Sequence, residues 1–452
     1  MPAVMTPPIV MPGDPGWDDA RQAWNLAVDQ HPAAVARPRS AEDVADVIRF
    51  ARQYGLRIAA QGTGHNAAPL GLLADTVLVK TERLREVSID PVARIARAEA
   101  GAVWAEVADA AAEPGLAALA GSSPDVGVVG YTIGGGLSWL GRAYGLSANN
   151  VEAVELVTAD GRLVRADAYT EQDLFWALRG GGGSFGVVTA IELRLFPVAE
   201  VYAGLLWWPA EAARPVLQAW RQLTQDDDLP DEFTSSARLL NIPPVPDFPE
   251  HLRGHSFVVI DVIYLGEPAD ADQLLAPLRA LQPMTDTIQV RPARALSHLH
   301  MDPEKRSPGV GDGLMLATLP AEAVETLVHV AGSGAGSALA VAELRHLGGE
   351  MRRARPGNGA LAAIDAEYAL FAGGPAPFPR VASAVAQSVA AVQTAMSPWA
   401  ARQMYLNFAE TARDPASFWT PQAYDRLRRI KAAVDPDNLI RSNHPVLPDR
   451  AP

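Results

Sequence analysis

The segment Arg57-Ile-Ala-Ala-Gln-Gly-Thr-Gly-His-Asn66 sets the expected architecture of the first part of the chain. Residues 57–60 predict a short strand, residues 61–66 a glycine-containing loop, and residues 76–80 a second strand. Glycine in such a loop lets the backbone approach a ligand closely, where side chains would collide. A loop of this kind between two strands is therefore typical of a cofactor site.

The sequence around this segment predicts an α+β unit over the first 200 residues. Ser40 and Asp43 have capping-box spacing, which predicts a helix that ends near Gly55. Strands are predicted at residues 94–99 and 151–158, and the second continues through a turn into residues 163–166 as a hairpin.

The glycine-loop pattern stops near Val201, and a second domain is predicted from there to about Ala400. Strands at residues 256–265 and 338–344 alternate with helices such as 379–395. Residues 229–249 are rich in Pro and Asp and predict a long surface loop.

The C-terminal part predicts one further helix. Thr420 and Pro421 supply an N-cap and a first-turn proline, and Asp435-Pro436 ends the helix.

Length and composition limit the classes of function. A chain of 452 residues with 48% hydrophobic and 20% charged residues predicts two or three folded units that are large enough to bury a cofactor. A formal net charge of −14 argues against nucleic acid or an anionic membrane as partner, because both need a basic face. The absence of cysteine excludes disulfides, thiolate metal sites and thiol nucleophiles. With neither a signal-like start nor a long apolar window, we expect a cytoplasmic protein that binds small molecules.

Three glycine-rich segments suggest a polyphosphate ligand: residues 61–66, 127–136 and 180–186. Each segment alone is equally consistent with a tight turn. Gly181, Gly183 and Gly186 match G-x-G-x-x-G, but a predicted helix precedes them and a predicted strand follows. A Rossmann site needs the opposite order, so a nicotinamide-binding unit is disfavoured.

His65 is the one histidine within a glycine loop, and on its own it is weak evidence. A loop histidine is most often a surface or hydrogen-bonding residue. No Cys, second His or carboxylate lies at ligand spacing around it, so no metal site is predicted.

Several segments together resemble the berberine bridge enzyme-like oxidoreductases of the vanillyl-alcohol oxidase and p-cresol methylhydroxylase superfamily, which share an FAD-binding domain of the PCMH type. The similarity lies in the order and spacing of residues 61–66, 121–137, 144–150, 173–188, 405–407 and 435–438. These segments cover both ends of the chain, whereas the middle matches only loosely, through residues 346–349.

The resemblance implies a two-part FAD-binding domain with an inserted substrate domain, an antiparallel sheet backed by helices. The expected boundaries are 1–200 for the FAD-binding domain, 201–400 for the substrate domain and 401–452 for a segment that returns to the FAD domain. His65 inherits the 8α-histidyl link to the flavin. Ser123 stands where many members carry a second, cysteinyl attachment, and Gln61 and Thr63 stand where Arg and Gly are common. We therefore expect a single covalent link, with tight noncovalent binding as the alternative.

The resemblance also assigns cofactor contacts and an electron acceptor. Val126 occupies a position that is associated with oxygen access, and a small residue there is associated with oxidases, so dioxygen is the expected acceptor. The expected cofactor-binding residues are Gly62, Thr63, Gly64, His65, Asn66, Ser122, Val126, Gly127, Gly130, Tyr131, Gly135, Gly136, Asn150, Gly186, Val188 and Asn407.

Tyr405 is the expected catalytic base, because it resembles the tyrosine of a Tyr-x-Asn motif that faces the flavin in several relatives. A tyrosine with an ordinary pKa near ~10 is a poor base at neutral pH and needs a nearby cation or hydrogen-bond donor. The alternative is a packed strand residue without a catalytic role. Reserve candidates for the base are Tyr131, Glu343, His346 and Tyr368.

The expected function is that of an FAD-dependent oxidase that takes hydride from a C–H bond next to an alcohol or amine and forms hydrogen peroxide. The alternatives are a dehydrogenase or oxidative cyclase with another acceptor, and a flavin-carrying protein without turnover. The substrate is expected to be a small organic molecule, with a secondary metabolite suggested only by the resemblance. The sequence predicts no oligomeric state.

Overall fold

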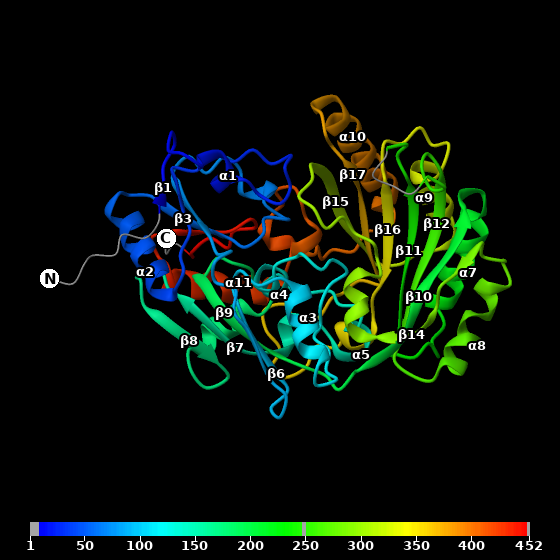
Figure 1. Cartoon of the computed structure of the whole chain (residues 1–452), viewed down its shortest axis with the longest axis horizontal. Coiled ribbons are helices and arrows are strands. Elements are labelled where there is room, and N and C mark those ends of the chain that lie inside the picture. Colours follow the sequence, from blue (N-terminus) through cyan, green and yellow to red (C-terminus); the bar gives the residue numbers. More distant parts are fainter. Residues whose placement is uncertain (1–8, 246–249, 450–452) are drawn as a thin grey trace.

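The computed structural model describes residues 9–245 and 250–449, and its strands form three sheets. One five-stranded sheet combines N-terminal strands with a strand from near the C-terminus, a second five-stranded sheet comes from the N-terminal half, and one eight-stranded sheet comes from the middle (Figure 1). The strands of the first sheet are β1 (Ile9–Val10), β2 (Ala34–Ala36), β3 (Arg57–Gln61), β4 (Thr76–Lys80) and β18 (Ile440–Arg441). The strands of the second are β5 (Val87–Asp90), β6 (Ile95–Glu99), β7 (Val151–Val157), β8 (Leu163–Asp167) and β9 (Val187–Arg194).

The first sheet brings the C-terminal segment beside the loop that contains His65. Its order is β1-β2-β4-β3-β18, and β18 runs parallel to β3 with Ile440 opposite Ile58. Helix α2 (Ala41–Gln53) packs its apolar side between the two five-stranded sheets, and the Ser40 side chain caps its N-terminus as predicted.

The second sheet is antiparallel, with the order β5-β6-β9-β7-β8. Helix α6 (Gln172–Leu178) leads through the glycine-rich residues 180–186 into β9. This helix-loop-strand order is the one that the sequence predicts, and it differs from the strand-loop-helix order of a Rossmann site. The other helices of this part are α1 (Trp17–Arg21), α3 (Trp104–Ala112), α4 (Val128–Ile133), α5 (Gly141–Tyr144) and α11 (Pro421–Val434).

The third sheet is antiparallel and has helices packed on one face. Its order is β13-β10-β12-β11-β16-β17-β15, and β14 pairs with β10. Its strands are β10 (Glu200–Pro209), β11 (Phe233–Asn241), β12 (Ser256–Tyr264), β13 (Thr285–Asp286), β14 (Gln289–Pro292), β15 (Gly309–Leu316), β16 (Val341–His346) and β17 (Tyr368–Pro375). The helices are α7 (Ala213–Thr224), α8 (Pro268–Arg279), α9 (Ala321–Ala331) and α10 (Pro379–Met396).

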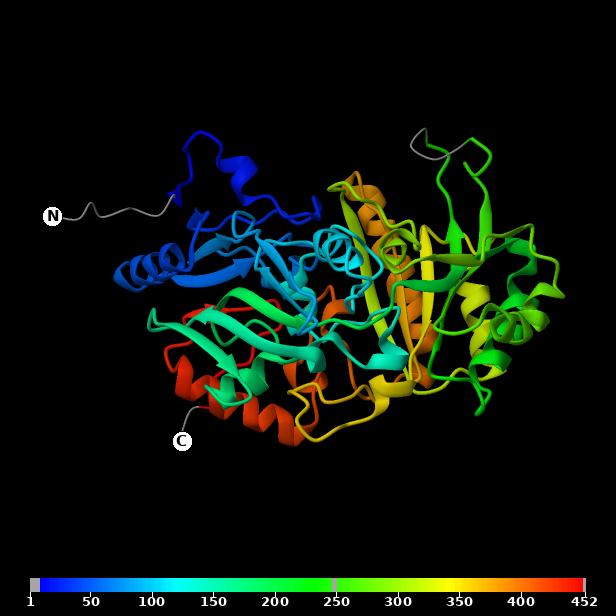
Figure 2. The same cartoon turned by 60° about the horizontal axis from the view of Figure 1, so that its bottom comes forward.

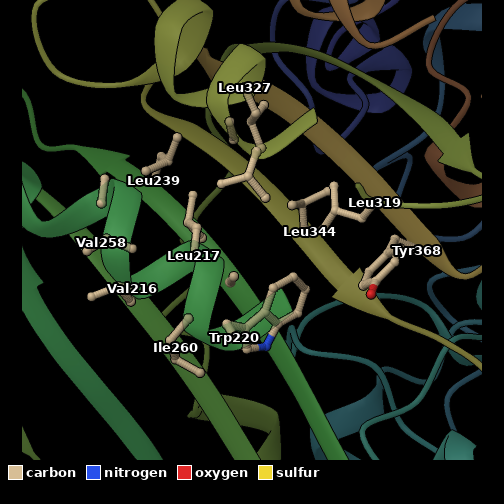
Figure 3. Packing of buried hydrophobic residues seen from close by; sticks show 14 of the residues in the cluster. Val216, Leu217, Trp220, Leu239, Val258, Ile260, Leu319, Leu327, Leu344 and Tyr368 are labelled. Atoms are coloured by element: carbon tan, nitrogen blue, oxygen red, sulfur yellow. The ribbon is translucent and has the colours of Figure 1, made fainter. Parts of the chain in front are cut away.

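A continuous apolar core joins these helices to the sheet. Figure 3 shows Trp220 and Leu217 of α7 beside Ile260 of β12 and Leu344 of β16, all fully or almost fully buried. Such a helix-covered antiparallel sheet agrees with the fold that the resemblance implies.

One prediction about this sheet is wrong. Residues 233–241, within the segment expected to be a surface loop, form β11, which pairs with both β12 and β16. Its polar residues are buried because they have partners, such as Ser235 with the Trp220 indole and Arg238 with Asp261. The Pro and Asp residues that suggested a loop lie on either side of the strand, and residues 246–249 are outside the described residues.

The second face of the eight-stranded sheet packs against the part that carries the glycine loops (Figure 2). Because side chains alternate along a strand, Ala342 and Leu344 of β16 face the helices, whereas Glu343 and Arg345 face the other way. Arg238 of β11 and Asp261 of β12 lie on this second face for the same reason. In the described ranges, no helix is both long enough and apolar enough to cross a membrane.

Candidate active site

One cavity brings together residues from both ends of the chain and from the middle. It lies where the loop after β3, helix α4, the residues before β9 and the C-terminal segment meet β16. The sequence-predicted residues that line it are Gly62, Thr63, Gly64, His65, Asn66, Ser122, Val126, Gly127, Gly130, Tyr131, Gly186, Val188, Tyr405 and Asn407.

His65 is held in a fixed orientation at the edge of this cavity. Its ring stacks on Trp24, with 4.2 Å between the ring centroids, and its Nδ1 lies 2.8 Å from the Thr63 hydroxyl. Nε2 is buried and has no hydrogen-bond partner among the described residues, although the Asp125 carboxylate lies 3.5 Å away. Burial alone would raise the pKa of Asp125, but the neighbouring His65 and the Trp24 indole outweigh burial and lower it.

The backbone around His65 requires glycine at position 64. Gly64 has a φ of +89°, and a Cβ there would lie 2.9 Å from the Ala23 side chain. The Asn66 amide donates to the carbonyls of Leu406 and Ala409, which connects this loop to the C-terminal segment.

A buried lysine lies behind the loop that contains His65. Lys80 of β4 lies opposite Gln61 and donates to its Oε1 at 2.7 Å. Burial lowers the pKa of Lys80 to about 8. The cation behind the loop therefore comes from β4.

The Tyr405 phenol accepts three hydrogen bonds. The backbone N–H groups of Gly136 and Leu137 donate to it at 2.9 and 3.1 Å, and the Asn407 amide donates at 3.1 Å. Burial raises the pKa of Tyr405 to about 12, while these donors and the charge of Arg345 act in the opposite direction. Tyr405 precedes a single 3₁₀ turn and is not part of a strand.

Gly134 is needed for the position of Asn407. A Cβ on Gly134 would lie 2.0 Å from Asn407 Oδ1, which is closer than atoms can approach. The Asn407 amide nitrogen also donates to the Tyr131 carbonyl at 2.9 Å. The second glycine segment therefore fixes the Tyr405–Asn407 pair by close packing.

Three predicted cofactor residues do not line the cavity. Gly135 and Gly136 lie behind its wall, where a Cβ would collide with Tyr405 and Ser147 respectively. Asn150 donates to the carbonyls of Tyr144 and Leu146 and holds a loop. The motifs marked the right segments, but they did not distinguish residues that face the cavity from residues that pack behind it.

The other candidates named from the sequence are spread over several environments. Tyr131 lines the cavity, and its buried hydroxyl has no partner among the described residues. Tyr368 lies on the helix-covered face and bonds to Thr224, and His346 packs beside it, next to Arg142. Ser123 donates to Asp125, the neighbour of His65.

Arg345 also lines the cavity, and the sequence analysis did not identify it. Its Nε donates to Glu343 at 2.7 Å and its Nη2 donates to Ser122 Oγ at 3.0 Å. The alternating pattern of β16 could have revealed it, since Glu343 and Arg345 are charged residues two apart in an otherwise apolar strand.

Arg345 belongs to a buried network of charges on the second face of the large sheet. His300 lies 3.5 Å from Glu343 and 3.3 Å from Asp261, and Arg238 forms a bidentate pair with Asp261. Burial and Arg238 lower the pKa of His300, but its three carboxylate neighbours outweigh them and raise it to about 9. The third carboxylate neighbour is Asp302, 3.8 Å from His300. His300 is therefore protonated at neutral pH, and the network contains three positive and three negative groups.

The residues of the cavity fit a flavin. His65 Nε2, Asn66 Oδ1 and Tyr131 OH are buried polar atoms without a partner in the described chain, and buried polar groups are normally hydrogen-bonded. Glycines 62, 64, 127, 130, 183 and 186 line the same cavity and leave room for a ligand against the backbone.

Comparisons with known proteins agree with this geometry. The sequence model of the family described as "FAD binding domain" matches residues 32–167, and that described as "Berberine and berberine like" matches residues 404–446. The (R)-6-hydroxynicotine oxidase of Paenarthrobacter nicotinovorans is 28% identical over 98% of this chain and 96% of its own. The glucooligosaccharide oxidase of Sarocladium strictum is 34% identical over 50% of this chain and 47% of its own.

Solved structures show the same fold over the whole chain. The BBE-like 1 protein of Physcomitrella patens superposes with a TM-score of 0.84 at 21% identity, over 98% of this chain and 97% of the other. The 6-hydroxy-D-nicotine oxidase of Arthrobacter nicotinovorans superposes with a TM-score of 0.81 at 25% identity, over 98% of both chains. The chain is therefore an FAD-dependent oxidoreductase that carries the FAD-binding and berberine-like domains and has the fold of the berberine bridge enzyme-like, PCMH-type FAD-linked oxidoreductases.

Proposed function

We propose that this enzyme is an oxidase whose FAD is bound covalently through His65 and whose substrate is a small organic alcohol or amine. When bound, FAD accepts a hydride from the substrate carbon and passes two electrons to dioxygen, which yields hydrogen peroxide. The relatives that are named as a hydroxynicotine oxidase and a glucooligosaccharide oxidase support an oxidase.

The observation that carries the proposal is that one cavity contains both an imidazole with a free ring nitrogen and a buried phenol whose oxygen is surrounded by hydrogen-bond donors. His65 lines it with a ring nitrogen that has no partner, and Tyr405 lines it with an oxygen that accepts three hydrogen bonds. The first group fits a cofactor link and the second fits a base.

His65 suits a covalent link because only one of its ring nitrogens is engaged. If Nδ1 carries the proton and donates it to Thr63, the lone pair of Nε2 is free to bond. Trp24 keeps the ring from rotating, and Asp125 stabilises positive charge on it. We therefore propose Nε2 as the atom that carries the flavin.

Tyr405 suits the base because hydrogen-bond donors and a cation partly offset the cost of a buried phenolate. Two backbone N–H groups and the Asn407 amide point at the oxygen where negative charge would develop, and the Arg345 guanidinium adds a positive charge nearby. In our proposal Tyr405 takes the proton of the substrate hydroxyl or amine while the neighbouring carbon loses hydride.

Reoxidation of the reduced enzyme tests the proposed acceptor without knowledge of the substrate. We expect that holoenzyme reduced anaerobically with dithionite returns to the oxidised spectrum within seconds of mixing with air and forms one hydrogen peroxide per flavin. Val126→Phe should slow this step, because Val126 lines the cavity and its side chain is small. Reoxidation that is slow in air but fast with a quinone would instead support a dehydrogenase.

A further inference from the structure

We infer that the substrate carries an anionic group, with a carboxylate as the simplest case, and that Arg345 binds this group. The inference rests on the proposed function, because it names the class of substrate for the same cavity. It makes an acidic alcohol the preferred substrate and disfavours a protonated amine.

One nitrogen of the Arg345 guanidinium is available to bind a ligand. Nε and Nη2 are engaged by Glu343 and Ser122, whereas Nη1 has no partner among the described residues. The side chain is 14% exposed, and the residue lines the cavity. A guanidinium that is bound along one edge can offer its other edge to a carboxylate.

The guanidinium is also held rigidly, so binding an anion requires little reorganisation. It lies between the rings of Trp139 and Phe408, at 5.3 and 5.2 Å from their centroids. Ser122, its third neighbour, donates to Asp302 and is thereby fixed as well. Preorganised groups of this kind bind their ligands more tightly than mobile ones.

The charge of the cavity wall favours an anion. Of the residues that the structure describes, the charged side chains that line the cavity are Arg345 and Arg441, and the titratable ones beside them are His65, Tyr131 and Tyr405. Glu343 is 3% exposed and lies behind Arg345, and Asp75, which pairs with Arg441, is outside the lining. Asp125 and Asp302 also lie outside the lining, where they accept hydrogen bonds from Trp24 and Ser122. At the wall itself an acid would therefore meet the Arg345 donor, whereas a protonated amine would meet no carboxylate.

The bound anion would lie close to the proposed base. The Phe408 ring is 5.2 Å from the Arg345 guanidinium and packs edge-on against Tyr405, with 5.5 Å between the ring centroids. The Arg345 guanidinium and the Tyr405 ring therefore both contact the Phe408 ring. We infer that the acidic group and the oxidised carbon are joined by a short spacer, as in a small hydroxy acid.

Three small aromatic probes of similar size and different charge test this inference on the flavin-loaded enzyme. Benzoate, benzamide and benzylamine would be titrated separately while the absorbance of the oxidised flavin is recorded. We expect benzoate to bind at least about tenfold more tightly than benzamide, and benzylamine to bind most weakly. This measurement needs no turnover, so a failure of the oxidase proposal in the air-reoxidation experiment would be seen separately.

Variants then assign the preference to Arg345. In Arg345→Gln the advantage of benzoate over benzamide should vanish, and in Arg345→Lys part of it should remain. Because Arg345→Gln removes one of the two cations beside Glu343 and leaves it only His300, the double variant Glu343→Gln/Arg345→Gln provides a second test that keeps the network neutral. Arg380→Gln, at the exposed start of α10, is the control and should leave the preference unchanged.

Two results would overturn the inference. One is that the wild-type enzyme binds benzoate no more tightly than benzamide or benzylamine. The absence of measurable benzoate binding counts as the same result. The other is a benzoate preference that survives in both Arg345→Gln and the double variant.

Discussion

At the scale of single residues, the Tyr405 phenol determines how the rate should depend on pH. Its pKa is raised to about 12 by burial, so only a small fraction is ionised at neutral pH. The rate of flavin reduction should therefore rise with pH between 6 and 8.5, by up to tenfold per unit. Tyr405→Phe should lower that rate by about 10²–10⁴-fold and remove the rise, while the flavin stays bound. Stopped-flow reduction at several pH values measures both effects.

Tyr169→Phe provides the matched control, since Tyr169 is 91% exposed. It should leave the rate and its pH dependence unchanged. An unaltered pH dependence in Tyr405→Phe would exclude Tyr405 as the base.

His300 should make the stability of the protein depend on pH. Its pKa of about 9 in the folded state exceeds the value near ~6.5 of an unfolded chain, so folding favours the protonated ring. The stabilisation is complete below pH 6.5 and is lost as pH rises towards 9, and its size is on the order of 3 kcal/mol. Urea unfolding of wild type should show this decline, and His300→Gln should show a flatter profile. Equal slopes for the two proteins would contradict the assignment.

The short motifs of the sequence identified some residues of the site and missed another. The resemblance pointed to His65, Tyr405 and Asn407, because these residues lie in short motifs with fixed spacing. It did not point to Arg345, which reaches the cavity from a strand of the middle segment, where the motifs are weak. A residue whose place depends on the packing of one sheet against another leaves little local signal in the sequence.

At the scale of elements, helix α11 is tied to its surroundings by one buried ion pair. Lys431 and Asp435 are both fully buried and bond at 2.5 Å, and Lys431 also donates to the carbonyls of Ser184 and Ile440. Asp435 in turn accepts from two backbone N–H groups at the start of β18. The pair thus connects α11 and β18 to the third glycine segment.

Lys431→Met should lower the free energy of unfolding by about 3–5 kcal/mol, because it leaves the Asp435 carboxylate buried without its cation. The surface pair Arg426–Asp173 on the same helix offers a matched control, and Arg426→Met should cost about 1 kcal/mol or less. Urea midpoints of the two variants give the comparison. A Lys431→Met protein as stable as Arg426→Met would show that the pair is unimportant.

Most elements could be predicted because local signals were strong. Thr420 caps α11 as expected, and the turn after β7 forms the predicted hairpin. Strand β11 could not be predicted, because its buried Ser and Arg residues are stabilised by partners on other elements, and a sequence pattern does not show those partners.

At the scale of the whole molecule, the cavity exists only where three parts of the chain meet. Bound FAD should therefore stabilise the complete fold. For His65→Ala prepared without flavin, we expect the melting temperature to rise with added FAD, which corresponds to about 2.7 kcal/mol at a hundredfold excess over Kd. Wild type should show no such dependence, because its flavin is already attached. Equal FAD dependence in both proteins would indicate noncovalent binding throughout.

The general architecture could be inferred because the flavin motifs occur at both ends of the chain and imply an insertion between them. The sequence did not indicate which face of the inserted sheet is turned towards the cavity. That direction follows from the alternation along β16, which places Leu344 towards the helices and Arg345 towards the cavity.

The covalent link at His65 is the central claim, and acid precipitation tests it most directly. Wild type and His65→Ala, both loaded with FAD, would be denatured in acid and centrifuged, and flavin absorbance would be recorded in the pellet and the supernatant. We expect flavin in the wild-type pellet and in the supernatant of His65→Ala. Flavin in the supernatant of both proteins would contradict the covalent link, and no flavin in any fraction would contradict the cofactor site itself.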